Sequence, residues 1–451
     1  MSHVPVLVQV LAVFALVVFA GSRKVHLGLA AALGGIAFAL VRGIPVTDAL
    51  RTAAGELAKP DTFLLLALVT VIMMFSSAMK KAGAMEAFSR ALAAVAPSPR
   101  IALAAAPLII GTLPMPGGAI LSAPLVDAFD PGRKRGGAVL STANYWFRHN
   151  LELAWPLYPA FILTSTMSGI PVGRLMVLNA YAAPALFILG LVFILPRGKP
   201  GDDAGPAGAR PEAPPEALPQ AGDTRVDATG RAGRVIRGFA PLAIVLGTYA
   251  ALDALWRALG PGLGLSPAAS ALAGRYLPIF LGLGAASLYV LAISPGKAVF
   301  SGSLAWPTVK LAAVVAGIRV FSALLEAGGV AEASAAELAA AGIPALAAAA
   351  VLPFTAGLVT GVGFGYVGLS FPIVLGLFPA GGGFPLEAVV VLAGAFGYAG
   401  MMLSPLHVCM VVSAGHFGTG LPAMIRRFAP PLALFVALGT VWAFALAWLA
   451  G

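Results

Sequence analysis

Four polar residues within an apolar stretch are the part of this sequence best equipped for chemistry. The segment 141–159 has the sequence STANYWFRHNLELAWPLYP and contains Asn144, Arg148, His149 and Glu152. Ionisable groups at membrane depth are costly and usually mark a functional site. Arg148 could attract an anionic solute and Asn144 could help to bind it, while His149 or Glu152 could take up a coupling proton.

Two simpler explanations apply to the same residues. Arg148 and Glu152 are four residues apart and would meet on one helix face, so they could be a buried structural ion pair. His149 and Glu152 could ligate a metal ion, but a metal site needs further ligands and none lies nearby in the sequence. The single cysteine, Cys409, lies in an apolar run, which predicts neither a disulfide framework nor a thiolate metal site. We expect no metal, no cofactor and no catalytic residue, and only H⁺ or Na⁺ as a coupling ion.

The composition places these residues in a membrane protein. Hydrophobic residues make up 59% of the 451-residue chain and charged residues 10%, with a mean hydropathy of +0.94. In soluble domains about a quarter of the residues are charged. Apolar runs of the length that crosses a membrane recur along the whole chain. We therefore expect an all-α polytopic protein embedded in the lipid bilayer.

Ten apolar runs are long enough to cross the hydrocarbon core. Two of them, 136–168 and 386–414, predict broken helices. The first contains Pro156 and Pro159, and prolines remove backbone donors and open a helix. The ten predicted spans are 4–20, 25–41, 62–79, 136–168, 174–196, 236–256, 271–293, 306–325, 386–414 and 428–448.

Two further apolar segments, 101–128 and 345–378, are interrupted by glycine and proline. The first contains GTLPMPGG at 111–118 and the second TGVGFGYVG at 360–368, so each predicts a re-entrant hairpin of two half-length helices. The start of the second half-helix offers free backbone N–H groups to an anion. The alternative is that the glycines only permit tight helix packing. The predicted solute-binding residues of the two tips are Gly117, Gly118, Ser122, Thr360 and Tyr366.

Residues 197–235 have a different composition, rich in Pro, Gly, Ala, Asp and Glu. Such a segment cannot bury enough apolar area to fold, so we expect a disordered linker between membrane halves 1–196 and 236–451. The net charge of +10 comes from short basic clusters between spans, a pattern that orients helices and argues against nucleic-acid binding. By the positive-inside rule the linker is cytoplasmic and both termini are outside, in the cytoplasmic (inner) membrane of a bacterium or archaeon.

The two halves align on each other at a constant offset. Phe75 matches Phe321 and Gly111 matches Gly357, since 321 − 75 and 357 − 111 both equal 246. The order of span, hairpin, broken span and span recurs in both halves. Five crossings separate a span from its counterpart, so the repeats are expected to be inverted. Inverted repeats with interrupted helices are the architecture of secondary transporters.

Two basic or titratable residues of the second half add to the candidate site. Arg319 lies mid-span, and we expect it to pair with Glu152 or Asp127 or to face the cavity as a second determinant of anion binding. His407 occupies the place of Tyr158 and could titrate near neutral pH, which makes it a third candidate for ion coupling. The second-half residues that match Arg148, His149 and Glu152 are Gly397, Tyr398 and Met401.

Four motifs resemble a known family. They are LPMPGGAILSAP at 113–124, NYWFRH at 144–149, WPLYP at 155–159 and GYAGMMLSPLH at 397–407. They are similar to an uncharacterised integral membrane family, domain of unknown function 401, which looks like a branch of the ion transporter superfamily. The resemblance covers most of the chain except the linker. It implies a scaffold-plus-transport-domain fold with two hairpins and two broken helices, and a homodimer through the scaffold helices, but no particular substrate.

The residues and the resemblance together predict a secondary active transporter of a small anionic solute, an organic acid or an inorganic anion. The transporter would be coupled to H⁺ or Na⁺ and would work by alternating access. The alternatives are a flippase of a lipid or lipid-linked substrate, or an intramembrane enzyme with His149 and Glu152 as acid and base. The chain has no HExxH or GxSxG motif, so we expect no enzyme.

Overall fold

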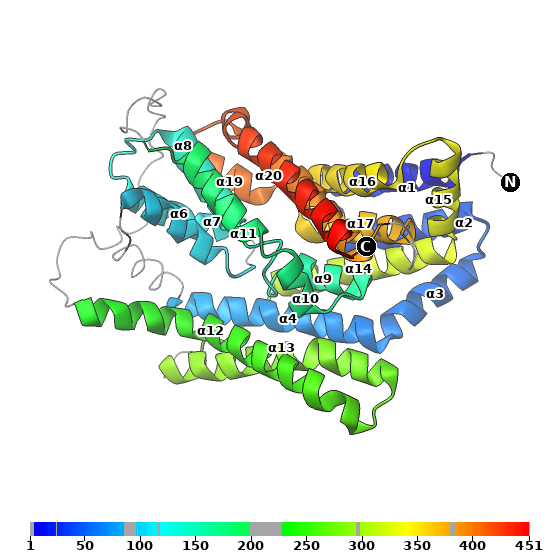
Figure 1. The fold of residues 1–451 in the computed structure, drawn as a ribbon, viewed down its shortest axis with the longest axis horizontal. Helices are drawn as coiled ribbons and strands as arrows, with labels where there is room; N and C mark the ends of the chain where they lie inside the picture. The colour runs from blue at the N-terminus through cyan, green and yellow to red at the C-terminus, as the bar shows by residue number, and fades with distance from the viewer. Residues whose placement is uncertain are drawn as a thin grey trace.

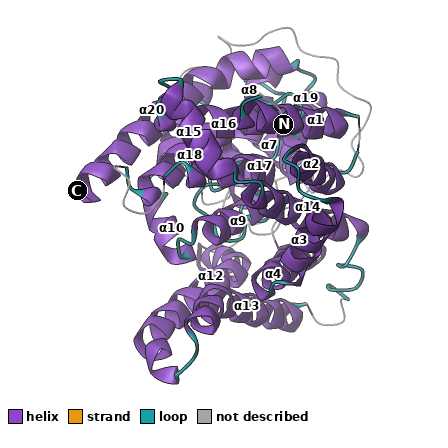
Figure 2. Ribbon diagram, turned by 90° about the vertical axis from the view of Figure 1, so that its right-hand side faces the viewer, coloured by secondary structure: helices purple, strands orange, loops and turns teal. Residues whose placement is uncertain are grey.

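Helices are the only regular secondary structure among the residues that the computed structural model describes (Figure 2). These residues are 4–23, 25–84, 96, 98–114, 118–197, 228–294, 298–378 and 384–450. A helix satisfies its backbone hydrogen bonds within one segment, which a chain of this apolar composition needs. The predicted all-α fold is confirmed.

The helices of the first half begin where the sequence supplies helix-starting residues. Pro60, Pro99 and Pro159 each occupy the first helical position, where the missing N–H costs nothing. The elements are α1 (Val6–Ser22), α2 (Leu27–Val41), α3 (Val46–Ala58), α4 (Pro60–Lys81), α6 (Pro99–Ile110), α7 (Gly118–Phe129), α8 (Gly137–Arg148), α9 (Pro159–Ser168), α10 (Val172–Leu178), α11 (Ala182–Leu189) and the π-helical η1 (Gly190–Ile194).

The second half begins with a helix that starts inside the predicted linker. The helix α12 spans Ala228–Leu259, so the prediction of disorder as far as residue 235 is wrong, while residues 198–227 lie outside the described residues. The other elements are the 3₁₀ turn η2 (Gly260–Leu263), α13 (Pro267–Ile293), α14 (Trp306–Ala327), α15 (Val330–Ala340), α16 (Ala345–Thr360), α17 (Gly363–Gly376), α18 (Leu386–Leu403), α19 (Val408–Phe417) and α20 (Leu421–Ala450).

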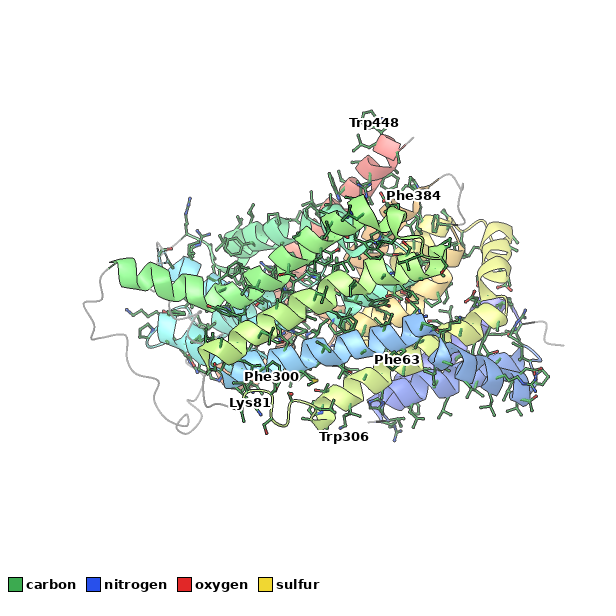
Figure 3. The ribbon with its side chains drawn as sticks, turned by 90° about the horizontal axis from the view of Figure 1, so that it is seen from below. Phe63, Lys81, Phe300, Trp306, Phe384 and Trp448 are labelled. Carbon is green, nitrogen blue, oxygen red and sulfur yellow. The ribbon has the colours of Figure 1, made fainter. Side chains whose placement is uncertain are left out.

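The length and composition of the helices make this a multi-pass membrane protein. Within the described residues, seven segments are long and apolar enough to cross a membrane, and shorter apolar helices accompany them. The outer surface is apolar as well, since Phe63 is 67% exposed and Trp448 82% exposed (Figure 3). Such side chains would be costly in water and are suited to a lipid environment.

Both predicted broken helices are interrupted near a proline. The helix α8 ends at Arg148, and turns and irregular backbone follow until α9 begins at Pro159. In the second half α18 ends at Leu403, and Pro405 lies in the short connection to α19. The opened backbone of the first break is largely enclosed by protein, which is the condition for irregular structure at membrane depth. In the second break Ser404 and His407 are buried, whereas Pro405 and Leu406 are exposed.

Each predicted hairpin consists of two half-length helices that pack on each other, α6 with α7 and α16 with α17. The tip of the second hairpin is shorter than predicted, because α16 continues to Thr360 and α17 begins at Gly363. Tyr366 therefore lies within α17. Gly361 ends α16 in a left-handed conformation, with φ +64°, which a residue with a side chain adopts only under strain. The re-entrant placement of the two hairpins stays a prediction.

The elements of the second half follow those of the first in order, and two of the corresponding pairs also agree in length. The helices α4 and α14 both have 22 residues, and their ends are separated by 246 positions (306 − 60 and 327 − 81). The helices α9 and α19 both have 10 residues and are separated by 249 positions (408 − 159 and 417 − 168). The offset found in the sequence is therefore also the offset between helix boundaries.

The long helices α4, α12 and α13 lie along one side of the molecule, and the hairpins and broken helices lie on the other (Figures 1 and 2). A polar cluster, partly buried, joins α4 and α13 to α3 and α14. Arg319 of α14 contacts Glu56 at 2.6 Å and Asp61 at 3.3 Å, and Arg275 of α13 contacts Asp61 at 3.0 Å.

The prediction that Arg319 pairs with Glu152 or Asp127 is wrong. Its partners come from α3 and from the start of α4, which helix packing brings to α14 although they are far away in the sequence. Glu56 and Asp61 neutralise the guanidinium of Arg319, so these contacts do not support its predicted role in anion binding.

Candidate functional site

The break between α8 and α9 lies between the tips of the two hairpins. The carbonyl of Arg148 packs so closely on Gly111, at the end of α6, that a Cβ on this glycine would overlap it. The hydroxyl of Tyr158 donates to the Gly111 carbonyl at 2.5 Å. On the other side, Oε1 of Glu152 lies 2.9 Å from the place of a Cβ on Gly363, the first residue of α17. The break is thus enclosed by elements of both halves.

Arg148 is buried, with 4% of its surface exposed. Its guanidinium lies on Gly118, the first residue of α7, where any Cβ would overlap Nη2. Nη1 donates to Sγ of Cys409 at 3.3 Å and lies 3.4 Å from Nε2 of His149. A guanidinium beside the N-terminus of a helix combines charge with backbone donors, and this is an arrangement suited to binding an anion.

Glu152 is 9% exposed, and its Oε2 has no hydrogen-bond partner among the described residues. No ion pair within 4 Å joins Glu152 to Arg148, both of which the structure describes. The alternative of a structural ion pair is therefore wrong. The reason is local, because α8 ends at Arg148 and the four-residue helical spacing does not continue to Glu152. The two charges point to different hairpins.

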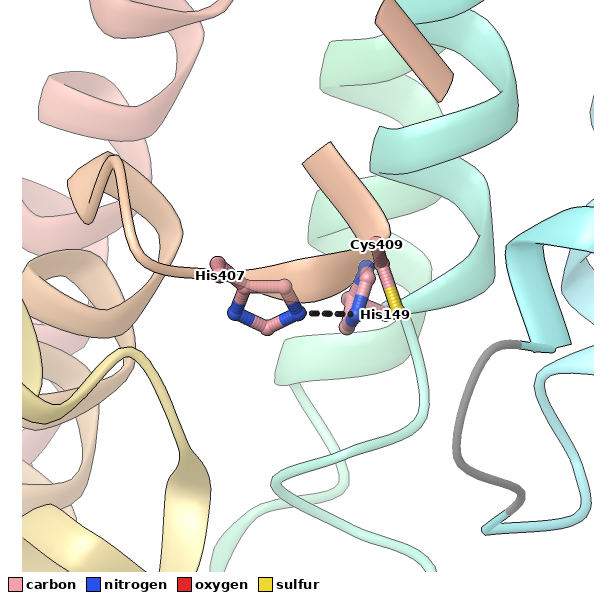
Figure 4. Close-up of side chains that lie close together, drawn as sticks. All are labelled: His149, His407 and Cys409. Carbon is pink, nitrogen blue, oxygen red and sulfur yellow. Dashed lines mark hydrogen bonds between the residues drawn. The ribbon is translucent and has the colours of Figure 1, made fainter. Parts of the chain in front are cut away.

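Two histidines and the cysteine meet between the two breaks (Figure 4). Nε2 of His149, which follows α8, lies 3.0 Å from Nε2 of His407, which precedes α19. Nδ1 of His149 lies 2.7 Å from the carbonyl oxygen of Tyr145, so Nδ1 carries the proton and Nε2 is the acceptor. Sγ of Cys409 lies in the same group, with all ligand atoms within 4.8 Å of one another.

Cys409 is the residue that the sequence interpretation missed. It comes two residues after His407, at the beginning of α19, and the packing of the two breaks places it beside His149. The statement that His149 has no further potential ligand nearby is true of the sequence and wrong for the structure. Alignment of the two breaks gives no signal for it, because Cys409 matches Ala160 at the offset that pairs His407 with Tyr158 (407 − 158 = 409 − 160 = 249).

Asn144 and Ser122 contribute to the walls of this region. Nδ2 of Asn144 donates to Oγ of Ser413 at 2.9 Å and to the carbonyl of Ala119 at 3.3 Å, so it links α8 to α19 and α7. Its Oδ1 is buried with no partner among the described residues. The hydroxyl of Ser122 donates to carbonyls of its own helix. Gly117 lies outside the described residues.

The predicted residues of the second tip lie on the opposite side of the site. The hydroxyl of Thr360 donates to the carbonyl of Ala356 at 2.7 Å, within its own helix. The ring of Tyr366 fills the space over Gly397 of α18, where a Cβ would overlap it. The structure thus brings Gly118, Arg148, His149 and His407 together. Glu152 lies beside Gly363, the first residue of α17, and Arg319 lies outside the site, where it pairs with Glu56.

Comparison with known proteins gives a family and a fold. The family described as "Protein of unknown function (DUF401)" matches residues 4–199 and 307–446, which is more than half of the chain. No curated protein matches the sequence. The crystal structure of the YdaH transporter of Alcanivorax borkumensis, described as having an unusual topology, is similar with a TM-score of 0.56 and 16% sequence identity. The match covers 87% of each chain.

Proposed function

We propose that this chain, which belongs to the DUF401 family of proteins of unknown function, is a secondary active transporter of a small anionic solute. The solute is an organic acid or an inorganic anion, and its movement is coupled to H⁺ or Na⁺ by alternating access. The fold shared with the YdaH transporter supports a transporter of some kind. The choice of an anion and of a coupling ion depends on the site.

The observation that carries the proposal is the meeting of four interrupted elements at one buried place. The two breaks and the starts of α7 and α17 come from both halves of the chain, and they surround Arg148 and Glu152. Half-helix termini and opened backbone around a midplane site are how secondary transporters bind solutes and ions. Structural packing alone does not require the same interruption twice.

Arg148 is proposed to bind the anion together with the first turn of α7. Its guanidinium lies directly on Gly118, so an anion at this helix N-terminus would also contact Arg148. Backbone N–H groups and a guanidinium together give charge-assisted hydrogen bonds in a site shielded from water. The corresponding position in the second half is Gly397, so the proposed anion site is single.

Glu152 is proposed to bind the coupling ion. Its carboxylate is enclosed and Oε2 lacks a partner among the described residues. A buried carboxylate without a partner costs several kcal/mol, and a proton or Na⁺ would remove that cost. Because Glu152 contacts the first residue of α17, binding of the ion would change the contact between the first break and the second hairpin. The roles predicted for His149 and His407 in coupling stay predictions.

The arrangement in the membrane belongs to the same proposal. The two halves would be inverted repeats in the inner membrane of a bacterium or archaeon, with the linker in the cytoplasm and both termini outside. The helices α4, α12, α13 and α14 would form the scaffold and hold a homodimer, and the hairpins and breaks would move against them.

The test is uptake of a panel of labelled organic acids and inorganic anions by proteoliposomes that contain the purified chain. Accumulation that needs an imposed H⁺ or Na⁺ gradient would support the proposal and name the coupling ion. Equilibration without accumulation would refute active transport. If no labelled compound moves, the lipid flippase or the intramembrane enzyme becomes the better explanation.

Three variants relate uptake to the proposed residues. Arg148→Ala should reduce uptake more than about tenfold, because charge-assisted hydrogen bonds are worth roughly 1.5–3 kcal/mol. Arg148→Lys keeps the charge but loses the planar fork, so it should retain part of the uptake. Arg174→Ala is the matched control, since Arg174 is half-exposed and pairs with Glu387 away from the site. Normal uptake by a folded Arg148→Ala protein would remove Arg148 from the site.

Glu152→Gln separates coupling from binding. This variant should still exchange labelled for unlabelled solute across the membrane. It should no longer accumulate solute when an H⁺ or Na⁺ gradient is imposed, because the amide cannot take up a proton and binds Na⁺ weakly. Gradient-driven accumulation at the normal level would show that the coupling ion binds elsewhere.

A further inference from the structure

We propose that His149, His407 and Cys409 form a binding site for a transition-metal ion of the Zn²⁺ type, between the two breaks. The inference concerns the resting protein and does not depend on which solute is transported. The three residues offer one ligand atom each, the atoms lie within 4.8 Å of one another, and all three side chains are buried. Figure 4 shows His407 and Cys409 turned towards His149.

The distances suit a metal with few ligands. Two nitrogen ligands of a tetrahedral zinc ion, each about 2.0–2.1 Å from the metal, lie roughly 3.3 Å apart. The two Nε2 atoms are 3.0 Å apart, so a small rotation of one ring would admit the ion. A metal would replace the hydrogen bond between the two rings, and the fourth position would remain open.

The chemistry of the donors favours a borderline or soft metal. Two imidazole nitrogens and one thiolate select Zn²⁺ or Cu⁺ over Mg²⁺ or Ca²⁺, which prefer oxygen ligands. The Nδ1 of His149 donates to the carbonyl of Tyr145 at 2.7 Å. This is the outer contact that orients metal-binding histidines, because it directs the lone pair of Nε2 towards the ligand group.

Arg148 adds a charge that bears on the cysteine. Its Nη1 lies 3.3 Å from Sγ of Cys409, so the guanidinium is in direct contact with one of the three proposed ligand atoms. The same atom lies 3.4 Å from Nε2 of His149, so the end of the flexible side chain must move aside when the ion enters. The metal would join His149 of the first half to two residues of the second.

The experiment measures metal binding by the purified full-length chain. The protein in detergent is equilibrated with Zn²⁺, free metal is removed, and bound zinc is counted by mass spectrometry. We expect about one Zn²⁺ per chain, and with Co²⁺ as the probe an absorption band from thiolate-to-metal charge transfer. Absence of bound Zn²⁺, or a Co²⁺ complex without the thiolate band, would overturn the proposal.

Variants identify the ligands. Cys409→Ser and His407→Gln should each weaken Zn²⁺ binding more than about tenfold. Only Cys409→Ser should abolish the charge-transfer band, because His407→Gln leaves the thiolate in place. His416→Gln is the matched control, because His416 contacts Asp127 at 2.6 Å in another part of the molecule, and it should bind Zn²⁺ normally. Equal binding by all three variants would refute the site. If a ligand variant fails to fold, the Co²⁺ spectrum of the unchanged protein decides alone.

Discussion

In both halves of the molecule a hairpin packs on a broken helix with the same close backbone contact, which we call the shared frame. The large side chain at this contact comes from the broken helix in one half and from the hairpin in the other. In the first half the side chain of Arg148, from the broken helix, lies on Gly118 of the hairpin. In the second half the side chain of Tyr366, from the hairpin, lies on Gly397 of the broken helix. The pairs correspond, since Gly118 and Tyr366 are 248 positions apart and Arg148 and Gly397 are 249 apart. In the first half the glycine is on the hairpin and the large side chain on the broken helix, and in the second half the two are exchanged. Because the large side chain is an arginine in the first half and a tyrosine in the second, only the first half carries a charge at this contact.

The backbone contact beneath these pairs is shared. The carbonyl of Arg148 touches Gly111, and the carbonyl of Gly397 touches Gly357 in the same way. Both hairpins thus approach their broken helix so closely that only glycine fits. The comparison teaches that the repeat preserves the frame, while the chemistry of each half depends on which element supplies the side chain.

The largest effect is expected when the shared frame is broken. Gly111→Ala and Gly357→Ala place a methyl group on a backbone carbonyl that cannot rotate away, so each should lower the free energy of unfolding by about 3 kcal/mol. Thermal unfolding of the purified protein measures this. Gly247→Ala in α12, where nothing lies within 4 Å, is the control and should be neutral or slightly stabilising. A frame that tolerates both alanines would contradict the shared close contact.

A smaller loss of stability is expected when the two exchanged pairs are disturbed. Gly118→Ala displaces the flexible end of Arg148 and Gly397→Ala displaces the Tyr366 ring, so each should cost roughly 1–3 kcal/mol. Only Gly118→Ala should also abolish solute uptake. Tyr366→Ala leaves a cavity of its own, but it should cost less thermal stability in the Gly397→Ala background than in the unchanged protein, because it removes the ring that meets the new methyl group. Equal loss of uptake in both single variants would refute the asymmetry.

The smallest effect concerns an ion-pair clamp at the end of the first hairpin, which has no counterpart among the described residues of the second. Asp127, at the end of α7, contacts Arg133 at 2.8 Å and His416 of α19 at 2.6 Å, and these groups are partly exposed. The matching position of the second hairpin, 248 residues on, is Leu375. Asp127→Asn should lower the thermal stability by about 1 kcal/mol or less, because partly exposed ion pairs are weak and screened by salt. A shift unchanged in high salt would argue against an electrostatic clamp.

The features of the fold that depend on local sequence could be predicted. Each of the ten predicted spans contains helix, although turns at residues 179–181 interrupt the fifth, 174–196, and the number of crossings stays a prediction. The two predicted breaks follow from Pro156, Pro159 and Pro405. The length of an apolar run and the presence of proline act within one segment, so they are visible without tertiary structure. The sequence predicts too long a tip for the second hairpin, because glycines such as Gly363 and Gly365 can also lie inside a helix.

What the sequence determined by itself is the membrane class, the repeat and the residue types of the site, because these depend on composition, period and offset. The tertiary structure alone decided the partners of each charge. It separated Arg148 from Glu152, paired Arg319 with Glu56 and Asp61, and brought Cys409 to His149 from 260 positions away (409 − 149). Contacts of this kind arise from how two halves of a chain dock, and no local spacing encodes them.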